Sequence, residues 1–245
     1  MALIDTSRLL FSDEYEVTQK ISVRHSTVGD VLRLGERRYF HILHTLTSIP
    51  SDEKWLLHTK GINWMDISDL EFFAMLAPSL KPEDSQIFFP GLDFSKFRLY
   101  KQDDGLLLFA DKANGITIDK FSHMKMMECL CTIHKIKKKV EIAGNEHTRQ
   151  VLLEDDKLRY ERALAKADMQ EYKSTLVPLI SALINREGFK YNYNTVGELR
   201  FGQFLDAAAR VQMIVATDQL IQGVYAGNVD AKKLDKKKFD WTREI

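Results

Sequence analysis

Two short stretches of the sequence begin in the same way: residues 26–31 read STVGDV and residues 194–199 read NTVGEL. In each stretch a threonine precedes an acidic residue by three positions. The two pairs are Thr27 with Asp30 and Thr195 with Glu198. At this spacing the hydroxyl accepts one backbone N–H and the carboxylate accepts another, so both stretches predict the start of a helix. The similarity ends after about nine residues, which disfavours an internal repeat. TVGEL also lacks the second glycine and the lysine of a phosphate-binding loop, which disfavours a phosphate site.

Around the first stretch, the pattern of apolar residues predicts a strand followed by three helices. YEVTQKISVRH alternates and carries β-branched residues, so we expect a strand over Glu16–Val23. From Thr27 apolar residues recur at helical spacing until Ile49, where a proline follows. Ser51 is placed to cap a second helix, and DISDLEFFAMLAPSL predicts a short third one. We expect these helices to pack on one another.

The middle of the chain changes to strands and then returns to helix. FRLYKQDDGLLLFADKANGITIDKF contains two turn signals, at 103–105 and 113–115, between short apolar runs. This pattern is typical of a three-stranded antiparallel meander. DKFSHMKMMECLCTIHKIKKK then predicts a helix that ends in four lysines, at positions 135, 137, 138 and 139.

The remaining sequence predicts helices and a charged tail. Residues 137–168 are charged and favour helix, which indicates an exposed connecting helix or linker. A helix follows in which Pro178 lies in the first turn or causes a kink. After it we expect a long helix capped by Thr195 and Glu198. The predicted fold class is α+β and predominantly helical, with a small meander and a helical C-terminal part. The predicted division is an α+β domain at 1–140, a charged helical connector at 141–168 and a helical domain with a charged, aromatic tail at 169–245.

Composition restricts the classes of function. The chain has 245 residues, of which 44% are hydrophobic, enough for one large or two small cores. Its 35 basic and 35 acidic residues leave no surplus of cations for a general nucleic-acid coat. The N-terminus lacks the pattern of a secretory signal, and no stretch approaches the roughly 18 apolar residues of a membrane span. We therefore expect a soluble protein that is not secreted by that route.

Three groups of residues have side chains that bind metals, and each also has a structural interpretation. The groups are Cys129, Cys131 and His134; His41 and His44; and Glu154, Asp155 and Asp156. None has the spacing of a known metal or nucleophile motif, so we interpret them as a buried cysteine with a surface histidine, core or surface histidines, and a solvated helix face. The sequence thus predicts no catalytic residue, no metal ligand and no cofactor.

Two rival classes stay open at this stage. A metal-dependent enzyme would use His41 with His44, or the two cysteines with His134. A nucleic-acid-binding regulator would use the lysines at 135–139 and those near the C-terminus, although no aromatic residues are interleaved with them. We favour a solvated helix end for these lysines.

The order of segments resembles a known group of phage proteins. The stretches concerned are VGDVLRLGERRYFHILHTLTSIPSDEKWLLHTKGINWMDISDLEFFAML, DSQIFFPGLDFSKFRLY and LIQGVYAGNVDAKKLDKKKFDWTREI. In this order they resemble tail-morphogenesis proteins of siphophages and prophages from Gram-positive hosts, in particular tail assembly chaperones. The resemblance implies a non-enzymatic protein of the host cytoplasm or the virion that binds phage proteins of the tape-measure or tail-tube class. A structural component of the tail or the head–tail connector is the alternative, and a homo-oligomer stays open.

The segment from Leu220 to Ile245, which includes the C-terminal tail, is the predicted protein-binding segment. Leu234, Phe239 and Trp241 are large apolar residues separated by lysines. Aromatic side chains of this kind carry much of the energy at protein interfaces, so we expect the tail to dock on a partner or on a sister subunit. The alternative is that Phe239 and Trp241 fold back onto their own helical domain.

Overall fold

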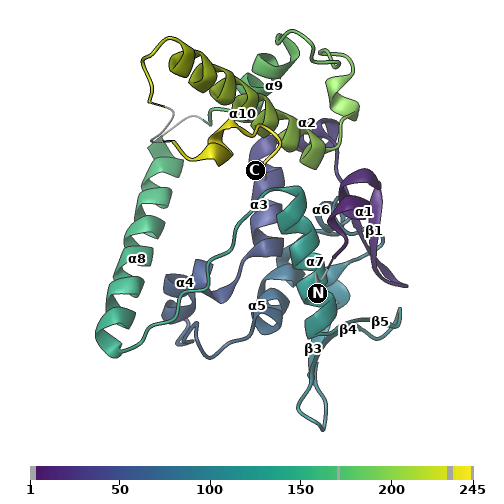
Figure 1. Cartoon of the computed structure of the whole chain (residues 1–245). Helices are drawn as coiled ribbons and strands as arrows, with labels where there is room; N and C mark the ends of the chain where they lie inside the picture. Colours follow the sequence, from purple (N-terminus) through teal and green to yellow (C-terminus); the bar gives the residue numbers. More distant parts are fainter. Residues whose placement is uncertain (1–3, 170–171, 231–233, 244–245) are drawn as a thin grey trace.

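The computed structural model describes residues 4–169, 172–230 and 234–243. Figure 1 shows helices packed around two small antiparallel sheets, with the C-terminal helices at one end of the molecule and a long hairpin at the other. The protein is therefore α+β and predominantly helical, as predicted.

The N-terminal region forms a short helix and a hairpin. Helix α1 (Thr6–Phe11) precedes strands β1 (Glu14–Thr18) and β2 (Ile21–Arg24), which pair antiparallel. The prediction of one strand over Glu16–Val23 is wrong, because the chain turns between β1 and β2. The alternation of apolar and polar residues that suggested a single strand continues on both β1 and β2, where Val17, Ile21 and Val23 are buried.

The first predicted helix is in fact two helices. Thr27 starts α2 (Val28–Leu34) with the predicted capping box, in which its hydroxyl accepts the N–H of Asp30. Gly35 then takes a φ of +87°, which interrupts the helix before α3 (Glu36–Thr47) begins. The apolar spacing runs through this break, so periodicity alone does not reveal it.

The next two helices are short. Ser51 does not cap a helix as predicted, because it lies inside the 3₁₀ turn η1 (Pro50–Asp52), and Glu53 precedes α4 (Lys54–Thr59). The third predicted helix is α5 (Asp69–Leu76), which begins with a capping box from Ser68. The 3₁₀ turn η2 (Ala77–Ser79), the short helix α6 (Pro82–Ser85) and the 3₁₀ turn η3 (Phe94–Lys96) lead to the second sheet.

The predicted antiparallel meander is confirmed. It consists of β3 (Arg98–Lys101), β4 (Leu107–Asp111) and β5 (Ile116–Ile118) in that order. Gly105 and Gly115 occupy the two turns with positive φ, a conformation that glycine adopts without a steric penalty.

The predicted helix with the lysines at its end stops earlier than expected. Helix α7 (Lys120–Ile133) ends before the lysines, and Ile136 to Asn145 has no helix. The charged stretch becomes regular only in α8 (Glu146–Met169), which contacts α4 and stands beside the main body in Figure 1. The C-terminal part comprises α9 (Leu176–Ile184), η4 (Val196–Glu198), α10 (Phe201–Tyr225) and η6 (Lys236–Phe239).

The two similar stretches of sequence lie against each other. The N–H of Val28 donates to the carbonyl of Leu199 at 2.9 Å, and the N–H of Phe201 donates to the carbonyl of Ser26 at 2.8 Å. A Cβ on Gly29 would lie 2.8 Å from the carbonyl oxygen of Gly197, so only glycine permits this approach. The stretches join the N-terminal and C-terminal parts of the chain through their backbones.

The prediction that Thr195 and Glu198 cap the long helix is wrong. The second stretch forms only the turn η4, and α10 starts after the extended residue Arg200, which forms a β-bridge with Thr27. The Thr195 hydroxyl accepts the N–H of Asn192 at 3.1 Å instead. Because Arg200 is held extended against Thr27, the helix begins only at Phe201.

The hydrophobic core takes residues from most of the chain. Its main cluster contains side chains of β1, β2, α2, α3, α5, α7, α9 and α10, including the ring cluster of Tyr39, Phe88 and Phe201. A second cluster joins α4, α5 and α8 through Leu57, Trp64, Phe72 and Leu153. The proposed division into domains at 1–140, 141–168 and 169–245 stays a prediction.

Candidate protein-binding surface

An apolar groove lies between the start of α5, the β3–β4 turn and the first turns of α7. Its cavity is about 810 Å³, a size in the range of about 300–1,000 Å³ that is typical of ligand pockets. We call it the α5–α7 groove; the residues that line it include Ser68, Asp69, Leu106, Phe121, His123 and Met124.

The walls of the groove expose large apolar side chains. Leu106 is 59% exposed, Phe121 is 55% exposed and Met124 is 43% exposed. Single exposed apolar residues are common on protein surfaces, but three that line one cavity form a patch of the kind that marks interaction sites. The local sequence explains their positions, because Asp104–Gly105 turns the hairpin just before Leu106, and the Asp119 cap starts α7 just before Phe121.

A buried histidine lies at the floor of the groove. His123 is 1% exposed, and its ring packs on Phe73 with a centroid distance of 4.7 Å. Its Nε2 has no hydrogen-bond partner among the described residues. Burial lowers the pKa of His123 to about 4, so the ring is neutral at neutral pH. The floor is therefore uncharged and holds one unpaired ring nitrogen.

The rim of the groove is acidic. Asp69 and Asp119 line it, and burial raises the pKa of Asp69 while Lys120 opposes that effect. The neighbouring carboxylates of the same turns belong to Asp66, Glu71, Asp103 and Asp104. None of these six carboxylates forms an ion pair with another described residue. A charged partner that complements this rim is basic.

A smaller opening continues the apolar surface along α7. Its cavity is about 290 Å³ and shares Asp69 and Met124 with the groove, followed by Met127, Cys131 and Ile136. Helix α7 therefore has two apolar faces, one in the core and one on the surface. Methionines adapt their shape to different partners, which suits a binding surface.

The predicted binding residues of the tail lie at the other end of the molecule. The tail backbone folds back on α10, where Arg210 donates to the carbonyls of Trp241 at 2.6 Å and Arg243 at 2.9 Å. Trp241 is 53% exposed, whereas Leu234 and Phe239 are half-buried. The structure thus holds the segment with Phe239 and Trp241 against α10, whereas the α5–α7 groove is formed by α5, the β3–β4 turn and α7. That the three residues bind a partner stays a prediction.

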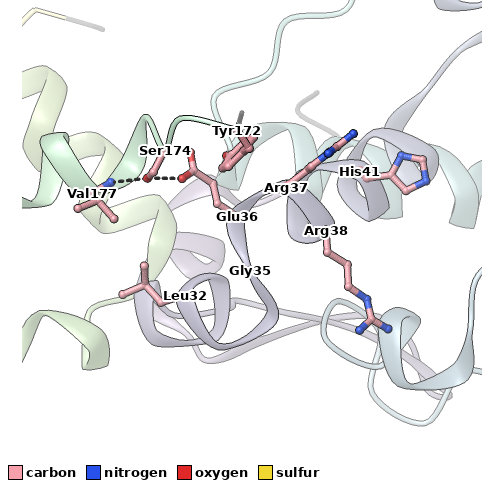
Figure 2. Close-up of a pocket in the computed structure, with 9 residues that line it drawn as sticks. All are labelled: Leu32, Gly35, Glu36, Arg37, Arg38, His41, Tyr172, Ser174 and Val177. Carbon is pink, nitrogen blue, oxygen red and sulfur yellow. Dashed lines mark hydrogen bonds between the residues drawn. The ribbon is translucent and has the colours of Figure 1, made fainter. Parts of the chain in front are cut away.

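A pocket of about 790 Å³ lies where α2 meets α3 and faces the start of α9 (Figure 2). Leu32 and Val177 lie at one end and the basic side chains of Arg37, Arg38 and His41 at the other.

The Glu36 carboxylate between the two ends of this pocket already has partners. It accepts hydrogen bonds from the hydroxyls of Ser174 and Thr175 and from the N–H groups of Thr175 and Leu176, so it caps α9. Burial alone would raise the pKa of Glu36, but these hydrogen bonds lower it. Arg38 is paired with Asp84 at 2.6 Å. Glu36 and Arg38 therefore serve contacts between elements of the fold.

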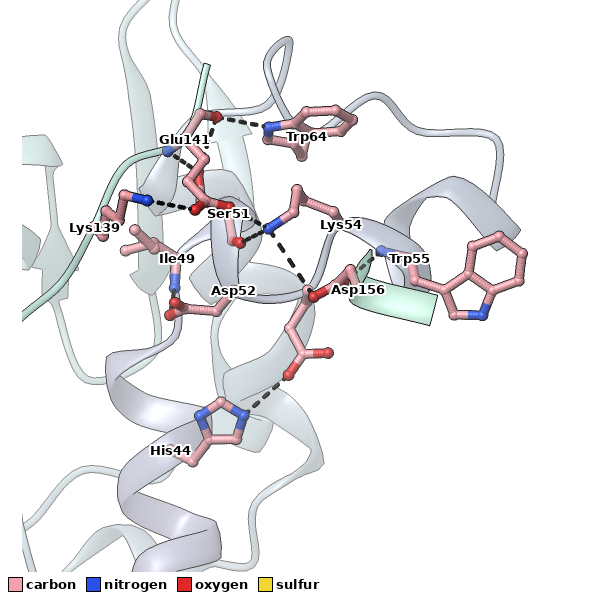
Figure 3. Close-up of polar contacts among 11 residues, drawn as sticks. His44, Ile49, Ser51, Asp52, Lys54, Trp55, Trp64, Lys139, Glu141 and Asp156 are labelled. Carbon is pink, nitrogen blue, oxygen red and sulfur yellow. Dashed lines mark hydrogen bonds and ion pairs between the residues drawn. The ribbon is translucent and has the colours of Figure 1, made fainter. Parts of the chain in front are cut away.

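A buried lysine ties the segment before α8 to the main body (Figure 3). Lys54 is 0% exposed, and its Nζ donates to the carbonyl of Ser51 at 2.6 Å and to the Glu141 carboxylate at 2.9 Å. Trp64 donates from its ring N–H to the Glu141 carbonyl at 2.9 Å, and Asp156 on α8 accepts the N–H of Trp55. Hydrogen bonds from Lys54 and Lys139 lower the pKa of Glu141 to about 2. We interpret this cluster as an anchor.

The structure separates the residues that the sequence offered as metal ligands. His134 is buried rather than on the surface, and it accepts a hydrogen bond from the Tyr39 hydroxyl at 2.7 Å. His44 pairs with Glu53, whereas His41 lines the pocket at α3. Asp156 is buried against α4, away from exposed Glu154 and Asp155. Within the described part of the chain, no three His, Cys, Asp or Glu residues lie together as a metal site.

Most of the lysines that follow α7 are paired with acids. Lys135 lies 3.2 Å from Asp206, Lys138 lies 2.7 Å from Asp52, and Lys139 lies 2.9 Å from Glu141. Lys135 directly follows the C-cap of α7, at the helix end as predicted, whereas Lys138 and Lys139 lie in the irregular segment after it. Their ion pairs attach this segment to the rest of the molecule and reduce the positive charge available to phosphate.

Sequence reasoning missed the α5–α7 groove. One signal was present, because Phe121, Met124, Met127 and Cys131 recur at helical spacing on the face of α7 that does not enter the core. What sequence alone does not supply is the position of Leu106 beside them.

Comparison with known proteins finds one family. The family model described as the YomV second domain matches residues 168–245, which include α9, α10 and the tail. This is a phage- or prophage-type family of Bacillus, so the match supports a phage-associated protein. No curated protein and no solved structure matches the chain. Among the described residues, none of the helices is long and apolar enough to cross a membrane.

Proposed function

We propose that this chain is a non-enzymatic phage morphogenesis protein, of the tail assembly chaperone type, that works by binding other phage proteins. The observation that carries the proposal is the α5–α7 groove, with three exposed apolar residues, an uncharged floor and an acidic rim. The match of residues 168–245 to a phage-type family supports the phage context. The proposed site of action is the host bacterial cytoplasm, with retention in the virion as the alternative.

The proposed partners are phage structural proteins of the tape-measure or tail-tube class. An assembly chaperone must cover apolar surface on its client until the client is incorporated, and an exposed groove of this size offers a matching surface. Its acidic rim favours client segments in which basic residues flank apolar ones.

Co-expression with candidate partners tests the proposal. We expect a complex between this chain and a tape-measure or tail-tube protein from the same prophage to co-elute in size-exclusion chromatography. Met124→Lys should abolish the complex, because it places a charge in the apolar wall. Phe11→Ser is the matched control, since Phe11 is 77% exposed on α1, outside the groove. Failure of every such partner to bind, or equal binding by Met124→Lys, would contradict the proposal.

Metal analysis tests the rival class of metal-dependent enzymes. Stoichiometric zinc in the purified protein that is lost in a variant with both His41 and His44 replaced by Gln would favour that class. We expect no such stoichiometric metal.

A further inference from the structure

We propose that the α5–α7 groove of one copy takes the C-terminal tail of a second copy of this chain. The contact would use Lys236–Trp241 of the second copy, presented on its helix α10. This inference deepens the proposed function, because it names one occupant of the groove on which that function rests.

The tail is held in a way that leaves its side chains available. Arg210 donates to the carbonyls of Trp241 and Arg243, and the Thr217 hydroxyl donates to the carbonyl of Lys238 at 3.4 Å. These contacts use the tail backbone and not its side chains. The backbone at Trp241 is therefore held on α10 while 53% of the residue stays exposed. A pre-positioned aromatic residue binds with a smaller loss of conformational entropy than a free one.

The tail segment 235–243 carries four basic residues and two acidic ones, so it has an excess of positive charge. Lys236, Lys237 and Lys238 are exposed, and in the described part of the chain none of them forms an ion pair. Asp69 and Asp119 line the groove, and Asp66, Glu71, Asp103 and Asp104 lie one or two positions from its lining residues in the sequence. Against them stand Lys120 in the wall and Lys125, which lies 4.8 Å above the Phe121 ring. Complementary charges of this kind give specificity and a faster association rate.

The tail and the groove also both expose apolar side chains that can pack against each other. Trp241 offers a large ring with one N–H donor, and the groove offers Leu106, Phe121 and Met124 beside carboxylate acceptors. A tryptophan at an interface gains from this combination, because its ring is desolvated while its N–H finds an acceptor on the rim.

The occupant must come from another copy. Figure 1 shows the C-terminal end beside α10, at the opposite end of the molecule from the β3–β4 turn that forms one wall of the groove. The described part of the tail is short and bound to α10, so it does not reach the groove of its own chain. Each copy then carries one tail and one groove, and two copies can close the contact reciprocally as a dimer.

The test measures self-association of the full chain by sedimentation velocity over a concentration series. We expect the wild-type chain to self-associate, with an association that weakens as salt is added. Met124→Lys in the groove and Trp241→Ser in the tail should each weaken self-association at least about tenfold. Both residues are exposed, so both variants should keep the thermal midpoint of the wild type. Phe11→Ser should associate as the wild type does.

Mixing the two variants gives the sharpest result. One variant keeps an intact tail and the other keeps an intact groove, so a mixture can form one of the two contacts of the dimer. We expect a heterodimer in the mixture at concentrations where neither variant associates alone. A monomeric wild type, or a mixture of folded variants that stays monomeric although each alone has lost association, would overturn the inference.

The outcome is separable from that of the proposed function. If the wild-type chain is monomeric but Met124→Lys loses the complex with a phage partner, the groove binds a client and not a second tail. If self-association follows the groove and the tail but no phage partner binds, the inference stands and the proposed function fails.

Discussion

Glycine at two positions allows the N-terminal and C-terminal parts of the chain to touch through their backbones. A Cβ on Gly29 would meet the carbonyl oxygen of Gly197 at 2.8 Å, and a Cβ on Gly202 would meet Nε2 of His25 at 2.7 Å. The N–H of Gly202 donates to that same nitrogen at 3.0 Å. The first contact ties the turn η4 to helix α2. The second ties the start of α10 to His25.

The first prediction concerns Gly29. Gly29→Ala should lower the free energy of unfolding by about 1–3 kcal/mol, because the added methyl group forces two packed backbone segments apart. Urea unfolding measures the change. Gly144→Ala is the control, since a Cβ there meets nothing within 4 Å, and it should be neutral or slightly stabilising. Equal stability of Gly29→Ala and wild type would show that the two stretches do not pack as described.

The second prediction concerns pH. Burial lowers the pKa of His25, His123 and His134 to about 4, well below the value of about 6.5 for an unfolded histidine. Between these values the unfolded chain binds more protons than the folded chain, so stability is full above about pH 6.5 and falls as the pH drops toward 4. The loss of unfolding free energy should reach a few kcal/mol. It should occur at pH values above those at which most carboxylates titrate.

Urea unfolding at about pH 7 and about pH 5 tests this expectation. In His123→Phe the difference in unfolding free energy between the two pH values should be smaller than in wild type, because one buried imidazole is gone. Phe11→Ser, a change at an exposed position that does not titrate, should leave the difference unchanged. A difference in His123→Phe as large as that of wild type would remove His123 from the explanation.

At the scale of elements, helices α7 and α8 are attached in different ways. Helix α7 is part of the main core through Met126, Leu130 and Ile133. Helix α8 has mainly exposed residues and reaches the body through Leu153, Asp156 and the anchor of Lys54. We infer that α8 is less strongly attached than α7, because it buries few apolar side chains.

The third prediction tests the anchor. Lys54→Met should lower the unfolding free energy by about 3 kcal/mol, since it removes the buried one of the two charge partners of Glu141 and the donor to the Ser51 carbonyl. Hydrogen exchange should become faster in residues 138–160. Lys157→Met is the control: Lys157 lies in an exposed pair with Glu161, and its loss should cost under about 0.5 kcal/mol. Unchanged exchange in Lys54→Met would show that Lys54 does not anchor the segment.

At the scale of the whole molecule, local signals in the sequence were the most informative. The capping box of Thr27 with Asp30 and the glycine turns of the meander depend on residues a few positions apart, and the structure confirms them. Thr195 has the same local signal as Thr27 but starts only a 3₁₀ turn. The difference arises from the pairing of Arg200 with Thr27, a long-range contact that no local pattern contains.

The candidate site was less predictable than the fold for the same reason. The tail residue Trp241 was recognisable as an exposed aromatic among lysines. The α5–α7 groove combines residues near positions 69, 106 and 121, and its exposed wall depends on which face of α7 enters the core. Periodicity shows that α7 has two apolar faces, but only the fold decides which one faces solvent.

The central claim is that this protein supports phage assembly by binding through the α5–α7 groove. The most direct measurement is the yield of particles with complete tails, counted by electron microscopy, after induction of a prophage from which this gene is deleted. Copies of the gene supplied on a plasmid should restore tails when they encode the wild type or Phe11→Ser, and should fail when they encode Met124→Lys at an equal level of folded protein. Normal tails in the deletion strain, or full restoration by Met124→Lys, would contradict the claim.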